Sequence, residues 1–233
     1  MARREISRDD PYIGWRVRLP EPELRPENTA LLIIDMQYSC SSPDHGTMKF
    51  RRENGYTNGL DYMAKRIDFI VPNIQRLQAA FRERKMEVIF CRIKAMRKDG
   101  RDRSRAHKDL NNFSPPGSID AEILEELKPL ENEMVFDKTT GSVFNSTTID
   151  YVLRNMGIEN LVMVGMMTGG CVESSVRDAK DLGYNVLVVD DGCGTWTHEM
   201  HEFALLVMDE VFGKVTTTDR VLAALPAVSN ASR

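Results

Sequence analysis

Six short apolar runs, separated by polar or helical sequence, are the feature that most constrains how this chain can fold. Runs of this length without polar alternation are typical of strands buried on both faces, as in parallel sheets. Their alternation with helical segments predicts one α/β domain, a doubly wound sheet of six parallel strands with helices on both faces. The predicted strands are residues 30–34, 87–92, 133–136, 161–164, 185–189 and 214–217.

The sequence between these runs contains helical spacing. In residues 63–84 apolar side chains recur every three or four positions, and Pro72 either kinks one helix or starts a second. A further helix is predicted to begin at Cys171. The other predicted helices are residues 119–127, 147–156 and 198–210.

Two long segments show no clear periodicity. Residues 37–58 are polar, with scattered aromatic residues and glycines, and are expected to form a loop over a site. Residues 94–108 are dense in Lys and Arg. They form either a solvated, mobile face or a lid that binds an anionic substrate.

One domain accounts for most of the chain. Residues 1–29 contain four prolines among charged side chains and are expected to form an extended N-terminal arm. Such an arm wraps its own body or a neighbouring subunit. The domain is predicted to cover residues 30–225, and residues 226–233 form a C-terminal tail.

The composition restricts the partners and the compartment. A net charge of -4 with 28% charged residues suggests neither a nucleic-acid nor a membrane partner. No apolar run approaches the length that spans a bilayer, and the N-terminal residues lack the apolar core of a signal peptide. The four cysteines have no paired spacing, which indicates a reducing compartment, so we expect a cytoplasmic protein.

Cys171 is the candidate nucleophile. It follows the predicted strand 161–164 and a turn that contains Gly169 and Gly170, and it opens a helix. Backbone N–H groups and the dipole at a helix start favour a thiolate and can bind an oxyanion. A purely structural role is the alternative, because free cysteines are often buried and only pack. Cys91 is predicted to lie in the core, whereas Cys40 and Cys193 follow strands and are possible pocket residues.

Two further reactive side chains are predicted to meet Cys171. Asp35 ends the first strand and Lys138 follows the third, and ligands bind parallel sheets at the carboxyl ends of their strands. Each is otherwise an ordinary turn or surface residue. Together they suggest a mechanism in which Lys138 stabilises the thiolate and Asp35 transfers the proton to a leaving group.

Four motifs resemble those of the isochorismatase-like cysteine hydrolases, in the expected order over residues 28–225. They are Asp35-Met-Gln37, Lys138 with Ser142-Val-Phe144 and Thr147, Gly165-Met-Met-Thr168-Gly-Gly-Cys171-Val172, and Arg177-Asp178-Ala179. The resemblance implies a Rossmann-like three-layer fold, homodimers or homotetramers, and a catalytic triad of Asp35, Lys138 and Cys171. It also implies a cis peptide at Met166-Met167 and an oxyanion hole formed by the backbone N–H groups of Met167 and Cys171.

Departures from related families narrow the expected chemistry. True isochorismatases lack the nucleophilic cysteine, so Cys171 favours hydrolysis of a small amide or ureide, with N-carbamoyl compounds, biuret or ureidoacrylate as the nearest substrates. Nicotinamidases resemble the chain but have a metal-binding Asp-x-His where this chain has Arg92-Ile-Lys94. We therefore expect no metal and no cofactor. The candidate substrate contacts are Gln37, Arg92, Lys94, Phe144 and Thr168, with packing the favoured role of Phe144; Arg92, Lys94 or Arg97 would receive a substrate carboxylate.

Three rival interpretations remain. Cys171 to Arg177 has the Cys-x5-Arg spacing of a cysteine phosphatase, but the intervening residues are predicted to be helical rather than a phosphate-binding loop. A binding or redox-sensing module would need only an oxidisable Cys171. His198-Glu-Met-His201 superficially resembles a zinc motif, but its spacing is i, i+3 and it is interpreted as a solvated helix start.

Overall fold

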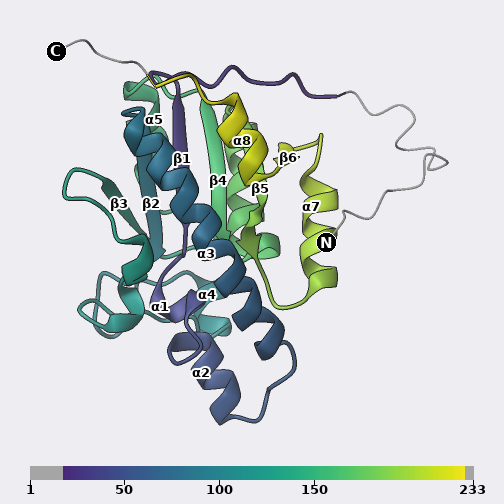
Figure 1. Ribbon diagram of the computed structural model, residues 1–233. Helices are drawn as coiled ribbons and strands as arrows, with labels where there is room; N and C mark the ends of the chain where they lie inside the picture. Colours follow the sequence, from purple (N-terminus) through teal and green to yellow (C-terminus); the bar gives the residue numbers. More distant parts are fainter. Residues whose placement is uncertain (1–17, 229–233) are drawn as a thin grey trace.

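The sheet has the predicted six strands, and all of them are parallel. The computed structural model describes residues 18–228, so most of the predicted arm and the last five residues of the tail lie outside the described part. The strand order is β3-β2-β1-β4-β5-β6 (Figure 1). The strands are β1 (Thr29–Ile34), β2 (Glu87–Ile93), β3 (Met134–Lys138), β4 (Asn160–Met166), β5 (Asn185–Gly194) and β6 (Lys214–Thr216).

The order of the strands reverses between β1 and β4. Successive strands extend the sheet in one direction from β1 to β3 and in the other from β4 to β6. The two central strands pair along their whole length, from Thr29 opposite Asn160 to Ile34 opposite Gly165. In doubly wound sheets such a reversal leaves a crevice at the carboxyl ends of the strands, which is where ligands bind.

Helices cover both faces, as predicted. Helices α3 (Leu60–Glu83) and α8 (Thr218–Ala224) pack against one face, and α5 (Ile149–Asn155), α6 (Glu173–Asp181) and α7 (His198–Met208) pack against the other. Figure 1 shows α3 crossing in front of the sheet. The apolar side chains on its inner face are at most 5% exposed, namely Met63, Ile67, Ile70, Ile74, Leu77 and Phe81. Burial of each such side chain contributes about 1.5–3 kcal/mol. The helix continues through Pro72, so of the two alternatives one helix forms.

The segment that was expected to be a loop, residues 37–58, contains two helices. These are α1 (Tyr38–Ser41) and α2 (Gly46–Glu53), which lie near the carboxyl ends of the strands with α4 (Arg105–Asp109) (Figure 1). Met48 is 1% exposed, and its burial anchors α2 to the body. The helix predicted over 119–127 is also wrong, because two 3-10 turns, Ile119–Ala121 and Glu125–Leu127, flank extended residues there.

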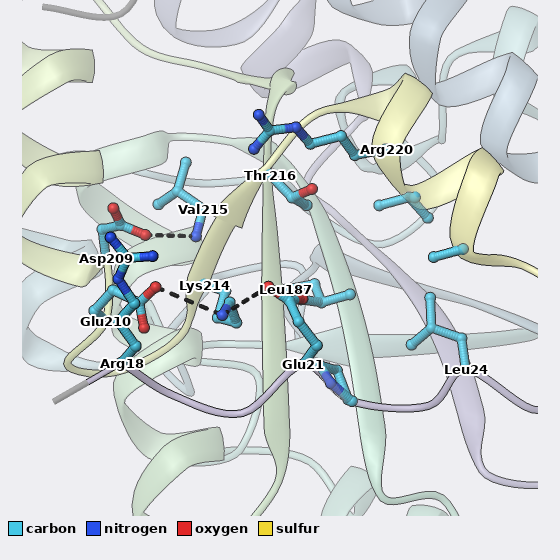
Figure 2. A pocket seen from close by; sticks show the side chains of 13 residues that line it. Arg18, Glu21, Leu24, Leu187, Asp209, Glu210, Lys214, Val215, Thr216 and Arg220 are labelled. Carbon is cyan, nitrogen blue, oxygen red and sulfur yellow. Dashed lines mark hydrogen bonds and ion pairs between the residues drawn. The ribbon is translucent and has the colours of Figure 1, made fainter. Parts of the chain in front are cut away.

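The described part of the arm, residues 18–28, packs on its own domain. Leu24 belongs to the hydrophobic core with 4% exposure, and the backbone oxygen of Glu23 accepts a hydrogen bond from Asn160 Nδ2 at 2.9 Å. Glu21 forms an ion pair with Lys214 at 2.7 Å. Figure 2 shows the hollow of about 610 Å³ between the arm, β6 and α8. Its lining includes none of Asp35, Lys138 and Cys171. Within residues 18–228 no helix is both long and apolar enough to cross a membrane.

Candidate active site

Asp35 lies at the carboxyl end of β1, beside the reversal of strand order. Its backbone is left-handed, with φ 54°, a conformation that aspartate tolerates better than most residues. The Asp35 N–H donates to the Cys91 carbonyl at 2.8 Å, and the Asp35 carbonyl accepts from Ser41 Oγ at 3.1 Å. The residue is 0% exposed. The carboxylate is therefore held in a dry position.

Lys138 reaches this carboxylate from β3. The strand is longer than predicted, so Lys138 is its last residue, paired in register with Ile93, rather than the residue after it. Its Nζ lies 2.9 Å from Asp35 Oδ2, donates to the Thr140 carbonyl at 3.0 Å and lies 3.3 Å from Cys171 Sγ. Nζ therefore has two hydrogen-bond partners, the Thr140 carbonyl and Cys171 Sγ, and forms an ion pair with Asp35. Lys138 thus links the acid to the thiol.

Cys171 is carried by the turn that follows β4. Residues Thr168–Val172 form a π-helical turn with non-helical dihedrals at Gly169 and Gly170, and α6 begins immediately after it. The Cys171 carbonyl accepts a 2.6 Å hydrogen bond from Ser175 Oγ. The peptide bond expected to be cis, Met166–Met167, is cis in the structure. Cys171 is partly exposed, unlike the other three cysteines, which are buried.

The electrostatics favour a neutral thiol at Cys171 in the resting protein, the state from which the predicted proton transfer to Asp35 would start. Burial and the negative charge of Asp35 raise the pKa of Cys171 to about 12, against the opposing charge of Lys138. Burial raises the pKa of Asp35, while Lys138 and a hydrogen bond with Cys171 oppose the rise. Burial alone would lower the pKa of Lys138, but the neighbouring charge of Asp35 outweighs it and raises that pKa. Lys138 is therefore an ammonium that lies beside Asp35, and Cys171 is a neutral thiol.

Comparison with known proteins places this geometry in a family. The family model described as the isochorismatase domain matches residues 29–220. The chain belongs to the isochorismatase-like family. It is therefore an isochorismatase-like hydrolase with a Rossmann-like α/β fold, as the motifs indicated.

Individual relatives of this isochorismatase-like chain agree with the assignment. Ureidoacrylate amidohydrolase RutB of Acinetobacter baylyi is 30% identical over 223 residues, which cover 87% of each chain. The protein of the same name from Variovorax paradoxus is 29% identical, covering 86% of this chain and 82% of the relative. A cysteine hydrolase from Pseudomonas syringae pv. phaseolicola has a solved structure that matches with a TM-score of 0.76 at 25% identity, covering 88% of this chain and 95% of that one.

Three of the candidate substrate contacts in this isochorismatase-like hydrolase are engaged by protein groups. Gln37 is 0% exposed; its Nε2 donates to the Ile93 and Asp120 carbonyls at 2.9 and 2.8 Å, and its Oε1 accepts from Ile93 N–H. Gln37 thereby joins the start of α1 to β2. Arg92 and Lys94 form ion pairs with Asp137 at 2.7 and 2.8 Å. Their contacts with substrate stay predictions, and any such contact would compete with these bonds.

The remaining candidates differ in their surroundings. Phe144 packs against the core and lies 6.0 Å from Tyr184, centroid to centroid, which agrees with the favoured packing role. Thr168 is 0% exposed, and its hydroxyl bonds to His201. Arg177 bonds to Glu173 Oε1 at 2.7 Å, and Glu173 to Arg177 is helical, so the Cys-x5-Arg spacing forms no phosphate-binding loop.

The histidine pair on α7 was interpreted wrongly for one of its members. His198 is exposed at the helix start, but His201 is 1% exposed and hydrogen-bonded on both ring nitrogens. The sequence gives little signal for this, because the partners Thr168 and Asp190 are distant along the chain. Within the described residues no group of three or more His, Cys, Asp or Glu side chains is arranged to hold a metal ion.

A second buried histidine, His107, makes stability depend on pH. It is 3% exposed, and its Nδ1 has no hydrogen-bond partner among residues 18–228. Burial, followed by the charges of Lys138 and Arg103, lowers the pKa of His107 from 6.5 to about 4. Between these values the unfolded chain binds the proton and the folded one does not, so stability falls as pH falls through this window.

We expect His107→Phe to reduce this loss. Wild type should lose about 2 kcal/mol more of its free energy of unfolding than the variant between pH 7 and pH 5. Urea unfolding at the two pH values measures the difference. His45→Phe replaces a histidine that is only partly buried and is the matched control. Its free energy of unfolding should depend on pH as that of wild type does. An identical pH dependence in His107→Phe and wild type would contradict the assignment.

Proposed function

We propose that this protein hydrolyses the C–N bond of a small amide or ureide through a thioester on Cys171. The observation that carries the proposal is the position of Lys138 Nζ, 2.9 Å from Asp35 Oδ2 and 3.3 Å from Cys171 Sγ. A buried cation between an acid and a partly exposed thiol can stabilise a thiolate while the acid holds its proton. Relatives named ureidoacrylate amidohydrolase support a ureide that carries a carboxylate.

The reaction begins with proton transfer from the Cys171 thiol to Asp35. The thiolate attacks the carbonyl carbon, the C–S bond forms, and the carbonyl electrons move to oxygen. Backbone N–H groups of Met167 and Cys171 are the proposed donors to this oxyanion. Asp35 then gives its proton to the departing nitrogen, the C–N bond breaks, and ammonia or an amine leaves.

Water completes the cycle. Asp35, again a carboxylate, accepts a proton from a water molecule while the water oxygen attacks the thioester carbon. The C–S bond breaks, an acid or carbamate leaves, and the proton returns to the Cys171 thiolate. Lys138 stays charged throughout and compensates whichever of its two neighbours is anionic. Homodimers or homotetramers stay a prediction from the resemblance, and a cytoplasmic location stays a prediction from the spacing of the cysteines.

Ammonia release from a panel of small amides and ureides tests the proposal. The panel contains N-carbamoyl amino acids, biuret, ureidoacrylate, maleamate and nicotinamide. Wild type should release ammonia from at least one ureide, and Cys171→Ala should lower the rate by about 10³-fold or more. Cys193→Ala, at a buried thiol outside the triad, is the matched control and should keep the activity.

Two results would contradict the proposal. Activity retained in Cys171→Ala would exclude a thioester at that residue. No ammonia from any compound, with wild type and Cys171→Ala alike, would favour the alternative of a binding or redox-sensing module.

A further inference from the structure

A row of three hydrogen-bonded side chains, two of them buried and the third partly exposed, begins at the Thr168–Val172 turn. Thr168 Oγ1 lies 2.8 Å from His201 Nδ1, and His201 Nε2 lies 2.9 Å from Asp190 Oδ1. Thr168 and His201 are 0% and 1% exposed. The row connects three elements, the turn after β4, helix α7 and strand β5. None of its members belongs to the proposed triad.

The charges around Asp190 fix the direction of these hydrogen bonds. Burial would raise the pKa of Asp190, but the hydrogen bond from His201 and the charge of Arg66 lower it, so the side chain is a carboxylate. It accepts from His201, which places the proton on Nε2. Arg66 Nη2 has the Asp190 carbonyl as its acceptor at 2.6 Å, although it also lies 2.8 Å from Nε2. His201 Nδ1 is then the acceptor for the Thr168 hydroxyl.

Packing brings the same helix against the same turn. A Cβ added to Gly169 would lie 3.3 Å from Ala204 Cβ, so α7 leaves no room for a larger residue there. Two residues of the turn thus meet α7: Gly169 packs closely against Ala204, and Thr168 is hydrogen-bonded to His201. On the other side, Cys171 Sγ meets Lys138 Nζ at 3.3 Å. The turn is therefore held between α7 and the Lys138 ammonium.

We propose that His201 and Asp190 are positioning residues that hold the Thr168–Val172 turn so that Cys171 faces Lys138 and Asp35. The inference rests on the proposed function. His201 fixes Thr168 through Nδ1, and Asp190 fixes the orientation of the imidazole through Nε2. His201 and Asp190 act through the backbone of the turn and do not touch the substrate.

Two conservative variants separate the two ring nitrogens. His201→Asn places an amide oxygen near the position of Nδ1 and can keep the bond to Thr168. His201→Gln places an amide nitrogen near the position of Nε2 and keeps only the bond to Asp190. In His201→Gln we expect kcat to fall by about 10- to 100-fold, the cost of a small displacement of a reacting group, with KM nearly unchanged. His201→Asn should stay within a few-fold of wild type.

Thr168→Val tests the same bond from its other end. The substitution removes the hydroxyl and keeps the shape, so kcat should fall as in His201→Gln. The double variant Thr168→Val/His201→Gln should have a kcat no lower than either single variant, because both substitutions remove the same hydrogen bond. His198→Gln, at the exposed start of the same helix, is the control and should leave kcat unchanged. Thermal melting of every variant reports whether the fold is intact.

A second readout needs no substrate. The rate at which iodoacetamide alkylates Cys171 at pH 8.5 depends on the contact with Lys138, which stabilises the thiolate. We expect this rate to fall several-fold in His201→Gln and Thr168→Val and to stay at the wild-type value in His201→Asn.

The outcomes distinguish this inference from the proposed function. Equal losses in His201→Asn and His201→Gln, with lowered melting temperatures, would show a core residue without a positioning role and overturn the inference. An active wild type with an unaffected His201→Gln would overturn it and leave the proposed function intact. If wild type hydrolyses no compound, the proposed function fails, and the alkylation rates alone decide whether His201 positions the turn.

Discussion

Asp35→Asn is expected to abolish hydrolysis and at the same time to make Cys171 more reactive. Hydrolysis should fall by about 10²–10⁴-fold, because no group remains to carry the proton to the leaving nitrogen. Alkylation should rise, because the charge of Asp35 is one of the causes that raise the pKa of Cys171. Removal of that charge leaves the thiolate as the anion nearest to Lys138, 3.3 Å away.

Iodoacetamide alkylation at pH 7.5 measures the second effect. We expect the alkylation rate to increase by about tenfold or more, since the neighbouring negative charge of Asp35 raises the pKa of Cys171 by about one unit or more. Asp191→Asn, in β5 and bonded to Thr218, is the control and should change neither rate. Parallel loss of hydrolysis and alkylation in Asp35→Asn would mean that the acid only maintains the structure.

Lys138→Met is expected to inactivate the protein and to destabilise it strongly. The side chains of Lys138 and Asp35 are 0% and 1% exposed, so removal of the cation leaves a buried carboxylate without compensation. Breaking such a pair costs about 3–5 kcal/mol of the free energy of unfolding. The double variant Asp35→Asn/Lys138→Met should recover much of this loss, because neither charge is then buried alone.

Urea unfolding of the single and double variants decides this point. Lys128→Met, which removes an exposed ion pair to Glu125, is the matched control and should change the free energy of unfolding by about 0–1 kcal/mol. If Lys138→Met unfolds at the wild-type urea concentration, the pair contributes little and the assignment of two buried charges is wrong.

The strands and the meeting point of the triad were predictable for local reasons. A buried parallel strand is written as a continuous apolar run, and all six runs proved to be strands. Asp35, Lys138 and Cys171 each end or follow such a run, so the topology rule alone places them at one edge. The small error at β3 did not matter, because Lys138 is at the end of the strand in either case.

The parts that failed depend on contacts between residues far apart in sequence. His201 lies in a polar helix start, and nothing near it indicates that Thr168 and Asp190 are its partners. The helix start favours a thiolate at Cys171, but burial and the charge of Asp35, which come from distant parts of the chain, raise its pKa. The ion pairs of Arg92 and Lys94 with Asp137 could not be read from the sequence either, and the substrate contacts of these two residues stay predictions.

Because solvent does not reach the Asp35–Lys138 pair, the strength of this contact does not depend on the ionic strength of the surroundings. Mobile ions screen charges in water over about 8 Å at physiological salt, but they have no access to a pair that solvent does not reach. The acid–cation contact therefore keeps its strength in concentrated salt. Under the proposed function, any salt dependence of turnover would lie in the capture of a charged substrate at the surface, before the chemistry begins.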